Sequence, residues 1–413
     1  MCDITVNDLL AVYEQLKDKY ELVMTDTRSL NDGFTINCPI LVGQAHEQII
    51  QLYEYDGWFV MDVMDKQRTK GTHWHPMDVS EAVEDITEFM EGNADYKLTP
   101  FPAISTVDFI LDTDPGADCD DMMALAYLIH AQRSLKVRIR AITQCNACPG
   151  GGDLIRTFFE HLGEPVPAIG SPVGNAKNYD NYCTPVLKRF GDGQIREYPD
   201  AVTVLRRALA ESENAVLCAI GPMNNIAALL RSKGDDISPL DGVSLVRERC
   251  AKVVLMAGGF VPGEDGRNKP EWNALVDIPA TQTMVELCPV PLVFLPFETG
   301  LDMLTGGPMM NKYGEDTPLS YSFSSFGDTR EAGGRHSWDP ATLVYAVEGC
   351  RNFFDESARG TVAVDEEGRT VMNADMNGLH SYLTIKPHDE LSEEQSKALI
   401  AEYIDRCSLS IHP

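Results

Sequence analysis

The sequence predicts an α/β protein with a doubly wound, mainly parallel open sheet, preceded by a small α+β domain. Two features of the chain predict it. From about residue 106 onward, short apolar runs alternate with helical stretches, which is the pattern of βαβ units. Before about residue 100 the pattern is helix, hairpin and helix instead. We therefore expect an accessory domain over residues 1–100 and a main domain over residues 106–413.

The composition is that of an ordinary folded protein. Of the 413 residues, 44% are hydrophobic and 23% are charged, and no apolar run reaches the roughly 18 residues that a membrane helix needs. The net charge of −29 argues against a nucleic-acid partner, because phosphate binding needs a basic surface. The N-terminus does not read as a signal peptide, and the eleven cysteines are scattered, so we expect reduced thiols and a cytoplasmic location.

The accessory domain is expected to contain two helices and a hairpin. Asp56-Gly57 separates two strand-like stretches, Glu47–Tyr55 and Trp58–Met64, and this dipeptide favours a tight hairpin turn. A capping-box pattern at Thr5–Asp8 starts a helix before the hairpin. An amphipathic stretch over residues 79–90 predicts a second helix after it. Nothing in this domain indicates a function.

The main domain is expected to alternate strands with helices. The predicted strands are Val107–Leu111, Val137–Thr143, Ala215–Ile220, Lys252–Met256 and Pro291–Leu295. The predicted helices include Asp120–Ala131, Asp153–Leu162, Ala201–Ser212 and Asn225–Arg231. A hairpin around Asp365–Gly368 follows, and Ser392 with Gln395 caps a last helix.

Polar side chains follow each of these strands. They are Asp112 and Asp114 after the first strand, Asn146 after the second, Asn224 after the third, Glu271 and Asn273 in the loop region after the fourth, and Glu298 after the fifth. In open α/β sheets, ligands bind outside the carboxyl ends of the strands. We therefore expect these side chains to converge at one edge of the sheet.

An acidic cluster is the most specific feature of the sequence. Between Asp112 and Asp121 there are five carboxylates within ten residues, and unpaired carboxylates this close repel one another. Capping of the next helix accounts for one or two of them. It does not account for Asp112 and Asp114, which end an apolar strand. A hard divalent cation with oxygen ligands resolves the repulsion, so we expect a Ca²⁺ site, with Mg²⁺ as the alternative.

Several motifs, in order along the chain, resemble the inosine-uridine preferring nucleoside hydrolase family. They are Asp112-Thr113-Asp114-Pro115-Gly116 followed by Asp120-Asp121-Met122-Met123-Ala124-Leu125, Gly221-Pro222-Met223-Asn224-Asn225, Met256-Ala257-Gly258-Gly259, Glu271-Trp272-Asn273 and Trp338-Asp339-Pro340. These matches cover roughly residues 106 to 410 and leave the first hundred residues outside the resemblance. The resemblance implies a metal-dependent N-ribosyl hydrolase that acts on small-molecule ribonucleosides, in a homo-oligomer of two or four chains.

The resemblance also implies a role for individual residues. Asp114 would bind the metal and act as general base, and Asp121 would be a bidentate metal ligand. The main-chain carbonyl of Asn224 and the carboxylate of Asp339 would complete the metal shell. The residues implied in ribose binding are Asp120, Asn146, Glu271 and Asn273. Carboxylates around the sugar would stabilise the positive charge that develops as the ribosyl C–N bond breaks.

Two departures from the family pattern leave roles open. Asp118 and Cys119 are inserted before the aspartate pair, so either Asp118 or Asp120 is the candidate for the ribose hydroxyl, and Asp120 is favoured beside Asp121. Trp338 stands where many family members carry a histidine that protonates the leaving base. His336 is the alternative candidate for this acid, whereas Trp338 is a candidate to stack on a base.

Other motifs carry weaker functional interpretations. Cys145 and Cys148 form a Cys-x-x-Cys without the context of a redox motif, and Pro149–Gly152 suits a tight turn better than a phosphate cradle. His73 and His75 lack a third zinc ligand nearby. Glu298 is expected either to line the site or to cap a helix.

Two other functions compete with the hydrolase. Asp112-Thr113-Asp114 after an apolar strand also resembles the start of haloacid-dehalogenase-like phosphatases, in which Asp112 would be the nucleophile. Gly116 does not fit that family's pattern, and the aspartate pair has no counterpart there. The missing histidine and the unassigned accessory domain would instead suit a non-catalytic binding protein on the same fold.

Overall fold

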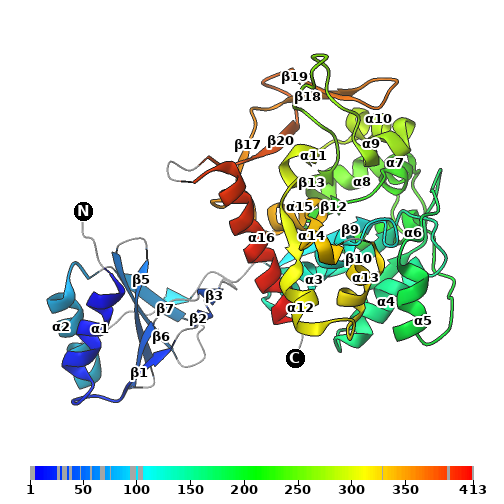
Figure 1. Cartoon of the computed structure of the whole chain (residues 1–413). Coiled ribbons are helices and arrows are strands. Elements are labelled where there is room, and N and C mark those ends of the chain that lie inside the picture. Colours follow the sequence, from blue (N-terminus) through cyan, green and yellow to red (C-terminus); the bar gives the residue numbers. More distant parts are fainter. Residues whose placement is uncertain are drawn as a thin grey trace. The chain divides into compact units, whose positions relative to one another are not determined.

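The computed structural model divides the chain into two compact units (Figure 1). The first comprises Met1–Thr106 and the short segment Ser134–Lys136, and the second comprises Val107–Arg133 and Val137–Pro413. The structure describes residues 5–25, 28–29, 35–36, 40–46, 48–55, 58–65, 70–74, 76–93, 99–100, 106–327, 329–387 and 391–411.

The first unit contains an antiparallel sheet with the strand order β1-β4-β5-β6-β7-β8. Its strands are β1 (Leu22–Thr25), β4 (Ile40–Ala45), β5 (Gln48–Tyr55), β6 (Trp58–Asp65), β7 (Lys70–Trp74) and β8 (Thr99–Pro100), and a separate pair is formed by β2 (Arg28–Ser29) and β3 (Thr35–Ile36). β5 and β6 form the expected hairpin, with Tyr55 opposite Trp58. One face of this sheet carries a small buried group, Ile40, Tyr53 and Val60. The other face carries the larger apolar set, which includes Leu41, Ile50, Leu52 and Phe59.

Two helices cover that face. The capping box at Thr5 and Asp8 starts α1 (Val6–Leu16), as expected, and α2 (Val79–Glu91) ends at Gly92, which adopts a left-handed φ of 73°. The core between helices and sheet contains Leu9, Val12, Leu52, Phe59, Ile86 and Phe89. The small α+β unit expected from the sequence is confirmed.

The second unit is built on a larger, mainly parallel sheet with the order β11-β10-β9-β12-β13-β14-β20-β18-β19, in which β17 also pairs with β20. Its strands are β9 (Val107–Thr113), β10 (Val137–Gln144), β11 (Ala168–Gly170), β12 (Ala215–Ala219), β13 (Cys250–Met256), β14 (Leu292–Leu295), β17 (Phe354–Glu356), β18 (Gly360–Val364), β19 (Thr370–Ala374) and β20 (His380–Ile385). The seven neighbouring strands β11, β10, β9, β12, β13, β14 and β20 pair in parallel. The remaining strands, β17, β18 and β19, form antiparallel pairs.

Helices cover both faces of this sheet (Figure 1). One layer consists of α3 (Asp120–Arg133), α4 (Gly151–His161), α5 (Cys183–Phe190), α12 (Gly307–Tyr313), α13 (Pro318–Ser325), α15 (Trp338–Glu348) and α16 (Glu393–Ser410). The other layer consists of α6 (Ala201–Ala210), α7 (Asn224–Arg231), α8 (Gly242–Arg249) and α10 (Ile278–Leu287). Along β9, Phe109 and Leu111 join the first core and Ile110 the second, as the two-residue period of a strand requires.

Short elements complete the second unit, and they lie mostly in the connections. These are α9 (Trp272–Val276), α11 (Phe297–Gly300), α14 (Thr329–Ala332) and the pair β15 (Leu304–Gly306) with β16 (Gly334–His336). The five strands and four helices predicted for this unit are confirmed, with no bound shifted by more than two residues. The doubly wound, mainly parallel fold class is therefore confirmed. Within the described residues, no helix has both the length and the apolar character needed to cross a membrane.

Candidate functional site

A cavity of about 270 Å³ opens at the carboxyl edge of the parallel strands. Acidic and aromatic side chains dominate its wall: Asp114, Asp118, Asp120, Asp121, Glu271 and Asp339 together with Tyr179, Trp272, Phe297 and Trp338. Arg335 and Asn181 add a cation and an amide. The volume is near the lower end of the ~300–1,000 Å³ typical of small-molecule sites.

The turn from β9 into α3 creates the acidic floor of this cavity. The chain reverses at Gly116, whose φ of 103° suits glycine, and α3 then begins with the buried residues Asp120 and Asp121. The Asp114 amide donates to Asp121 Oδ1 at 3.0 Å, and the Thr113 hydroxyl donates to the same oxygen. Asp121 Oδ2 is buried and has no hydrogen-bond partner among the described residues.

Three carboxylates from two helices meet at this floor. Asp120, Asp121 and Asp339 can each offer one oxygen such that the three oxygens lie within 4.8 Å of one another. Asp120 also has a structural role. Its Oδ2 accepts the main-chain amides of Trp338 and Asp339 at 3.1 Å and so holds the start of α15 against α3.

Asp114 reaches the same cavity from the end of β9. A Cβ atom added to Gly221 would lie 2.5 Å from Asp114 Oδ1, which is closer than any van der Waals contact allows. Gly221 therefore allows the close approach of the Asp114 carboxylate to the loop after β12.

This group consists of carboxylates alone, so no basic side chain within it compensates their negative charge. Burial raises the pKa of Asp114, Asp120, Asp121 and Asp339 well above the usual carboxyl value, and repulsion between the neighbouring carboxylates raises it further. A divalent cation fits this site, since every donor is a carboxylate oxygen and one of them, Asp121 Oδ2, lacks a partner. Oxygen-only ligation favours Ca²⁺ or Mg²⁺ over softer metals.

Asp118 lies apart from the three-carboxylate group. Its carboxylate pairs with the Arg335 guanidinium, with Arg335 Nε 2.9 Å from Asp118 Oδ1, and the Cys119 amide donates to the same oxygen at 2.7 Å. Of the two aspartates that the sequence left open, Asp120 is therefore the one in the cluster, and Asp118 is engaged by Arg335.

Glu271 and Asn273 line the opposite part of the cavity. The Glu271 carboxylate accepts the amides of Gly258 at 3.1 Å, Asn273 at 2.8 Å and Ala274 at 3.1 Å, so it caps α9 and ties it to the loop after β13. Burial raises the pKa of Glu271 to about 7. The side-chain amide of Asn273 donates to the main-chain carbonyls of Met256 at 3.0 Å and Ile220 at 3.2 Å.

Three predicted site residues are not among those that line the cavity: Asn146, Asn224 and His336. The Asn146 amide is occupied by the backbone of Tyr179, donating to its carbonyl at 2.7 Å and accepting its amide at 2.9 Å. The Asn224 amide donates to the Val173 carbonyl at 2.8 Å. His336 Nδ1 accepts the Asp302 amide at 2.9 Å.

The environment of His336 also disfavours its charged form. Its pKa lies below the usual value because the ring is partly buried and the Arg335 guanidinium is close. His336 instead packs against Trp338, with the ring centroids 5.0 Å apart.

The aromatic wall contains residues that sequence reasoning did not find. Trp338 stacks on Phe297 with the ring centroids 5.5 Å apart, and its indole N–H donates to the Phe297 carbonyl at 2.8 Å. Tyr179 and Trp272 form a second pair with the centroids 5.6 Å apart. Trp272 stands inside the Glu271-Trp272-Asn273 motif and could have been found there. Tyr179 and Arg335 come from distant segments with no local signal.

The weaker motifs have structural explanations. The Glu298 carboxylate accepts the Phe260 amide at 2.7 Å and is not part of the cavity wall. Gly150 has a φ of 86° at the tight turn that starts α4. Asp112 is buried among Thr143 and Asn225 outside the cavity, which argues against a phosphatase nucleophile at this position. The side chains of His73 and His75 lie outside the described residues.

Comparisons with known proteins point in one direction. The family model described as inosine-uridine preferring nucleoside hydrolase matches residues 109–408. A solved structure of an inosine-uridine preferring nucleoside hydrolase from Bacillus anthracis is similar at 16% identity, with a TM-score of 0.54, over 73% of this chain and 99% of that one. The search of curated proteins finds no match.

Two further solved structures have the same fold. A purine-preferring ribonucleoside hydrolase from Gardnerella vaginalis is 18% identical, with a TM-score of 0.54, over 74% of this chain and 99% of that one. The effector protein XOO4466 is 15% identical, with a TM-score of 0.51, over 73% of this chain and 94% of that one. At these identities the similarity establishes the fold alone.

Proposed function

The chain belongs to the inosine-uridine preferring nucleoside hydrolase family, and we propose that it hydrolyses the N-glycosidic bond of ribonucleosides, or of a related ribosylated compound, to give ribose and the free base. The observation that carries this proposal is the buried group of Asp120, Asp121 and Asp339, with Asp114 beside it, in a cavity at the carboxyl edge of the sheet.

The carboxylates have distinct proposed roles. Asp121, Asp339 and Asp114 would hold a Ca²⁺ ion, with Mg²⁺ as the alternative, and the family pattern adds the main-chain carbonyl of Asn224. When bound, such an ion would lower the pKa of a water molecule at the site, and the resemblance to the family implies that it would also bind the ribose hydroxyls. Asp114 would accept the proton of the attacking water. Asp120 would accept a hydrogen bond from a ribose hydroxyl with its second oxygen, since Oδ2 is occupied by two amides.

The remaining polar wall would orient the sugar. Glu271 and Asn273 line the cavity and are held by several backbone hydrogen bonds each, which suits groups that must keep one geometry. Asn146 would act on the sugar indirectly, because its amide positions Tyr179 at the cavity wall. The carboxylates would also stabilise the positive charge of the ribosyl transition state.

The base would lie against the aromatic wall. Trp338 and Phe297 form one apolar surface, and Tyr179 and Trp272 form another, so the cavity suits a flat ring. Diol recognition makes a specific prediction: a 2′-deoxyribonucleoside should turn over at least about 100-fold more slowly than its ribonucleoside, as expected when a buried polar group loses its partner. Equal turnover of the two would contradict the proposed roles.

A binding protein that does not catalyse hydrolysis is the second candidate. It is favoured by one observation, namely that no histidine lines the cavity within the described residues, whereas Trp338 stands at the position of the family's acid. A panel of ribonucleosides incubated with the protein and Ca²⁺, with free ribose as the readout, tests both candidates. Ribose release that needs the cation supports the hydrolase. Ca²⁺-dependent binding of a nucleoside without release supports the binding protein.

A further inference from the structure

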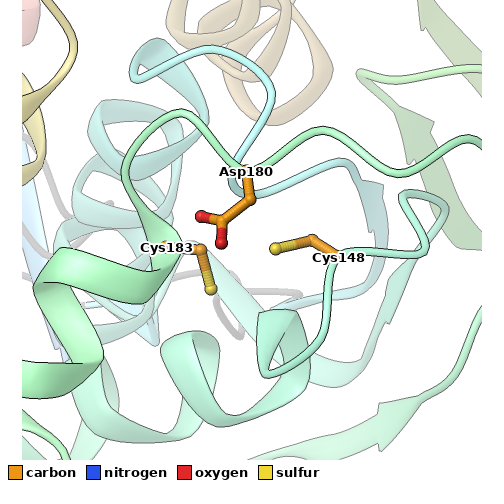
Figure 2. Close-up of side chains that lie close together, drawn as sticks. All are labelled: Cys148, Asp180 and Cys183. Carbon is orange, nitrogen blue, oxygen red and sulfur yellow. The ribbon is translucent and has the colours of Figure 1, made fainter.

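A second group of potential metal ligands lies outside the cavity. Figure 2 shows Cys148, in the loop between β10 and α4, close to Asp180, in the loop before α5, and to Cys183, the first residue of α5. One atom from each side chain can be chosen so that the three atoms lie within 4.8 Å of one another. Both cysteines are buried and Asp180 is exposed.

The two thiols point at the same place. Both Sγ atoms lie close to the Pro149 carbonyl oxygen, at 3.7 Å for Cys148 and 3.9 Å for Cys183. The Asp180 carboxylate is oriented as well, because it accepts the Thr184 amide at 2.9 Å and the Thr184 hydroxyl. Secondary hydrogen bonds of this kind fix the ligands of metal sites.

We propose that Cys148, Cys183 and Asp180 bind a Zn²⁺ ion. Two thiolates and one carboxylate suit Zn²⁺, whereas Ca²⁺ and Mg²⁺ take oxygen ligands. Three protein ligands leave one tetrahedral position, and the solvent exposure of Asp180 allows water to take it. Binding converts both thiols to thiolates and therefore releases two protons.

This ion would stabilise one wall of the substrate cavity. Asp180 stands between Tyr179 and Asn181, which both line the cavity. The main-chain N–H of Asn181 donates to the Gly116 carbonyl at 2.8 Å. A Cβ added to Gly116 would lie 3.3 Å from Cys148 Sγ, so the cysteine pair packs directly under the turn that leads to the acidic floor. Zn²⁺ would thus join the loop after β10 to the segment carrying Tyr179.

Titration of the metal-stripped full chain with Co²⁺ tests this site. Thiolate ligation of Co²⁺ produces a charge-transfer band in the near ultraviolet, and oxygen ligation at the acidic group does not. We expect this band to saturate at about one equivalent of Co²⁺ and to disappear when Zn²⁺ is added. Zn²⁺ should also raise the Tm of the stripped protein.

Variants locate the site. Cys148→Ala and Cys183→Ala should each abolish the band, and Asp180→Asn, at an exposed position, should weaken Co²⁺ affinity roughly 10-fold or more while keeping the fold. Cys288→Ala is the matched control, because Cys288 is also buried with its thiol near a backbone carbonyl, at 3.6 Å from that of Val290, yet lies outside the group.

Two results would overturn the proposal. They are the absence of a thiolate band in the wild-type protein and a band that persists in the Cys148→Ala/Cys183→Ala double variant. None of these readouts uses ribose release, so failure of the zinc site and failure of the proposed hydrolase are separable.

Discussion

At the scale of single residues, Asp114 combines two demands. It must lie close enough to Asp121 for its own amide to donate to that carboxylate at 3.0 Å, and its side chain must still face the cavity. Asp114→Asn keeps the shape and one oxygen but removes the proton acceptor. We expect kcat for ribose release to fall roughly 10²–10⁴-fold, the usual contribution of general-base catalysis.

The control for this variant is substrate binding. Because Asp114 is also a proposed ligand of the cation, the kinetics are measured at saturating Ca²⁺. If Asp114 acts on the water, KM under these conditions should change much less than kcat, which steady-state kinetics with a ribonucleoside measures. An Asp114→Asn protein with wild-type kcat would exclude the proposed role and would favour another carboxylate as the base.

Gly221 is the second residue whose identity the geometry requires. The Cβ of an alanine would lie 2.5 Å from Asp114 Oδ1 and 2.6 Å from Cys145 Sγ, and both atoms are buried. Gly221→Ala should therefore displace the Asp114 carboxylate, lower cation affinity and reduce kcat at least about 10-fold, with about 1–3 kcal/mol lost in the free energy of unfolding from overpacking.

Isothermal titration with Ca²⁺ and chemical denaturation measure these effects. Gly263→Ala is the matched control, because the nearest atom to its added Cβ is 3.6 Å away, an ordinary van der Waals distance. Wild-type cation affinity in Gly221→Ala would mean that the Asp114 position is not needed for binding.

At the scale of elements, the sequence predicted those parts of the fold whose signal is local. The central strands are buried on both faces, so they appear as continuous apolar runs, and the helices carry caps. β11 spans only Ala168–Gly170, too short for any pattern. β20 contains His380, Ser381 and Thr384, and its place between β14 and β18 depends on pairing partners far away in the sequence.

The same distinction applies to the candidate site. The part of the acidic floor formed by Asp114, Asp120 and Asp121 was predictable, because these residues are near neighbours in sequence and their repulsion needs an explanation. Arg335 could not be found in this way, since its pairing with Asp118 joins segments more than 200 residues apart. Asn146 follows a strand as predicted, but hydrogen bonds to Tyr179 decide where its side chain points, and those depend on the folded loop.

A buried arginine joins α6 to the loop between α7 and α8. Arg206 of α6 is 1% exposed, and it pairs with Asp235 at 2.8 Å and donates to the carbonyls of Ser238 and Leu240 at 2.9 Å. Arg206→Met should lower the free energy of unfolding by about 2–4 kcal/mol, because these carbonyls lose their donor in the interior. Denaturant unfolding measures the loss, and the exposed neighbour variant Arg207→Met should stay near the wild-type value.

At the scale of the whole molecule, the net charge of −29 means that the buried acidic group adds to the electrostatic repulsion that destabilises the folded state. A bound cation would reduce this repulsion. Without the ion, the pKa values of Asp114, Asp120, Asp121 and Asp339 lie well above the value of 3.8 expected in the unfolded chain. The folded state then holds more protons than the unfolded state, so its stability falls as the pH rises through this interval.

A bound cation removes this penalty, and its effect should therefore grow with pH. We expect the Tm increase caused by Ca²⁺ to be small at about pH 5, because protons then occupy the carboxylates. It should be larger at about pH 8, because protons no longer compete with the ion for these carboxylates. Differential scanning calorimetry across this range, with and without the ion, measures it. Asp339→Asn removes one of the repelling carboxylates, so the metal-free variant should lose less stability with rising pH than the wild type and should gain less from Ca²⁺. Parallel pH profiles for the two metal-free proteins would mean that the acidic group does not govern the stability of the fold.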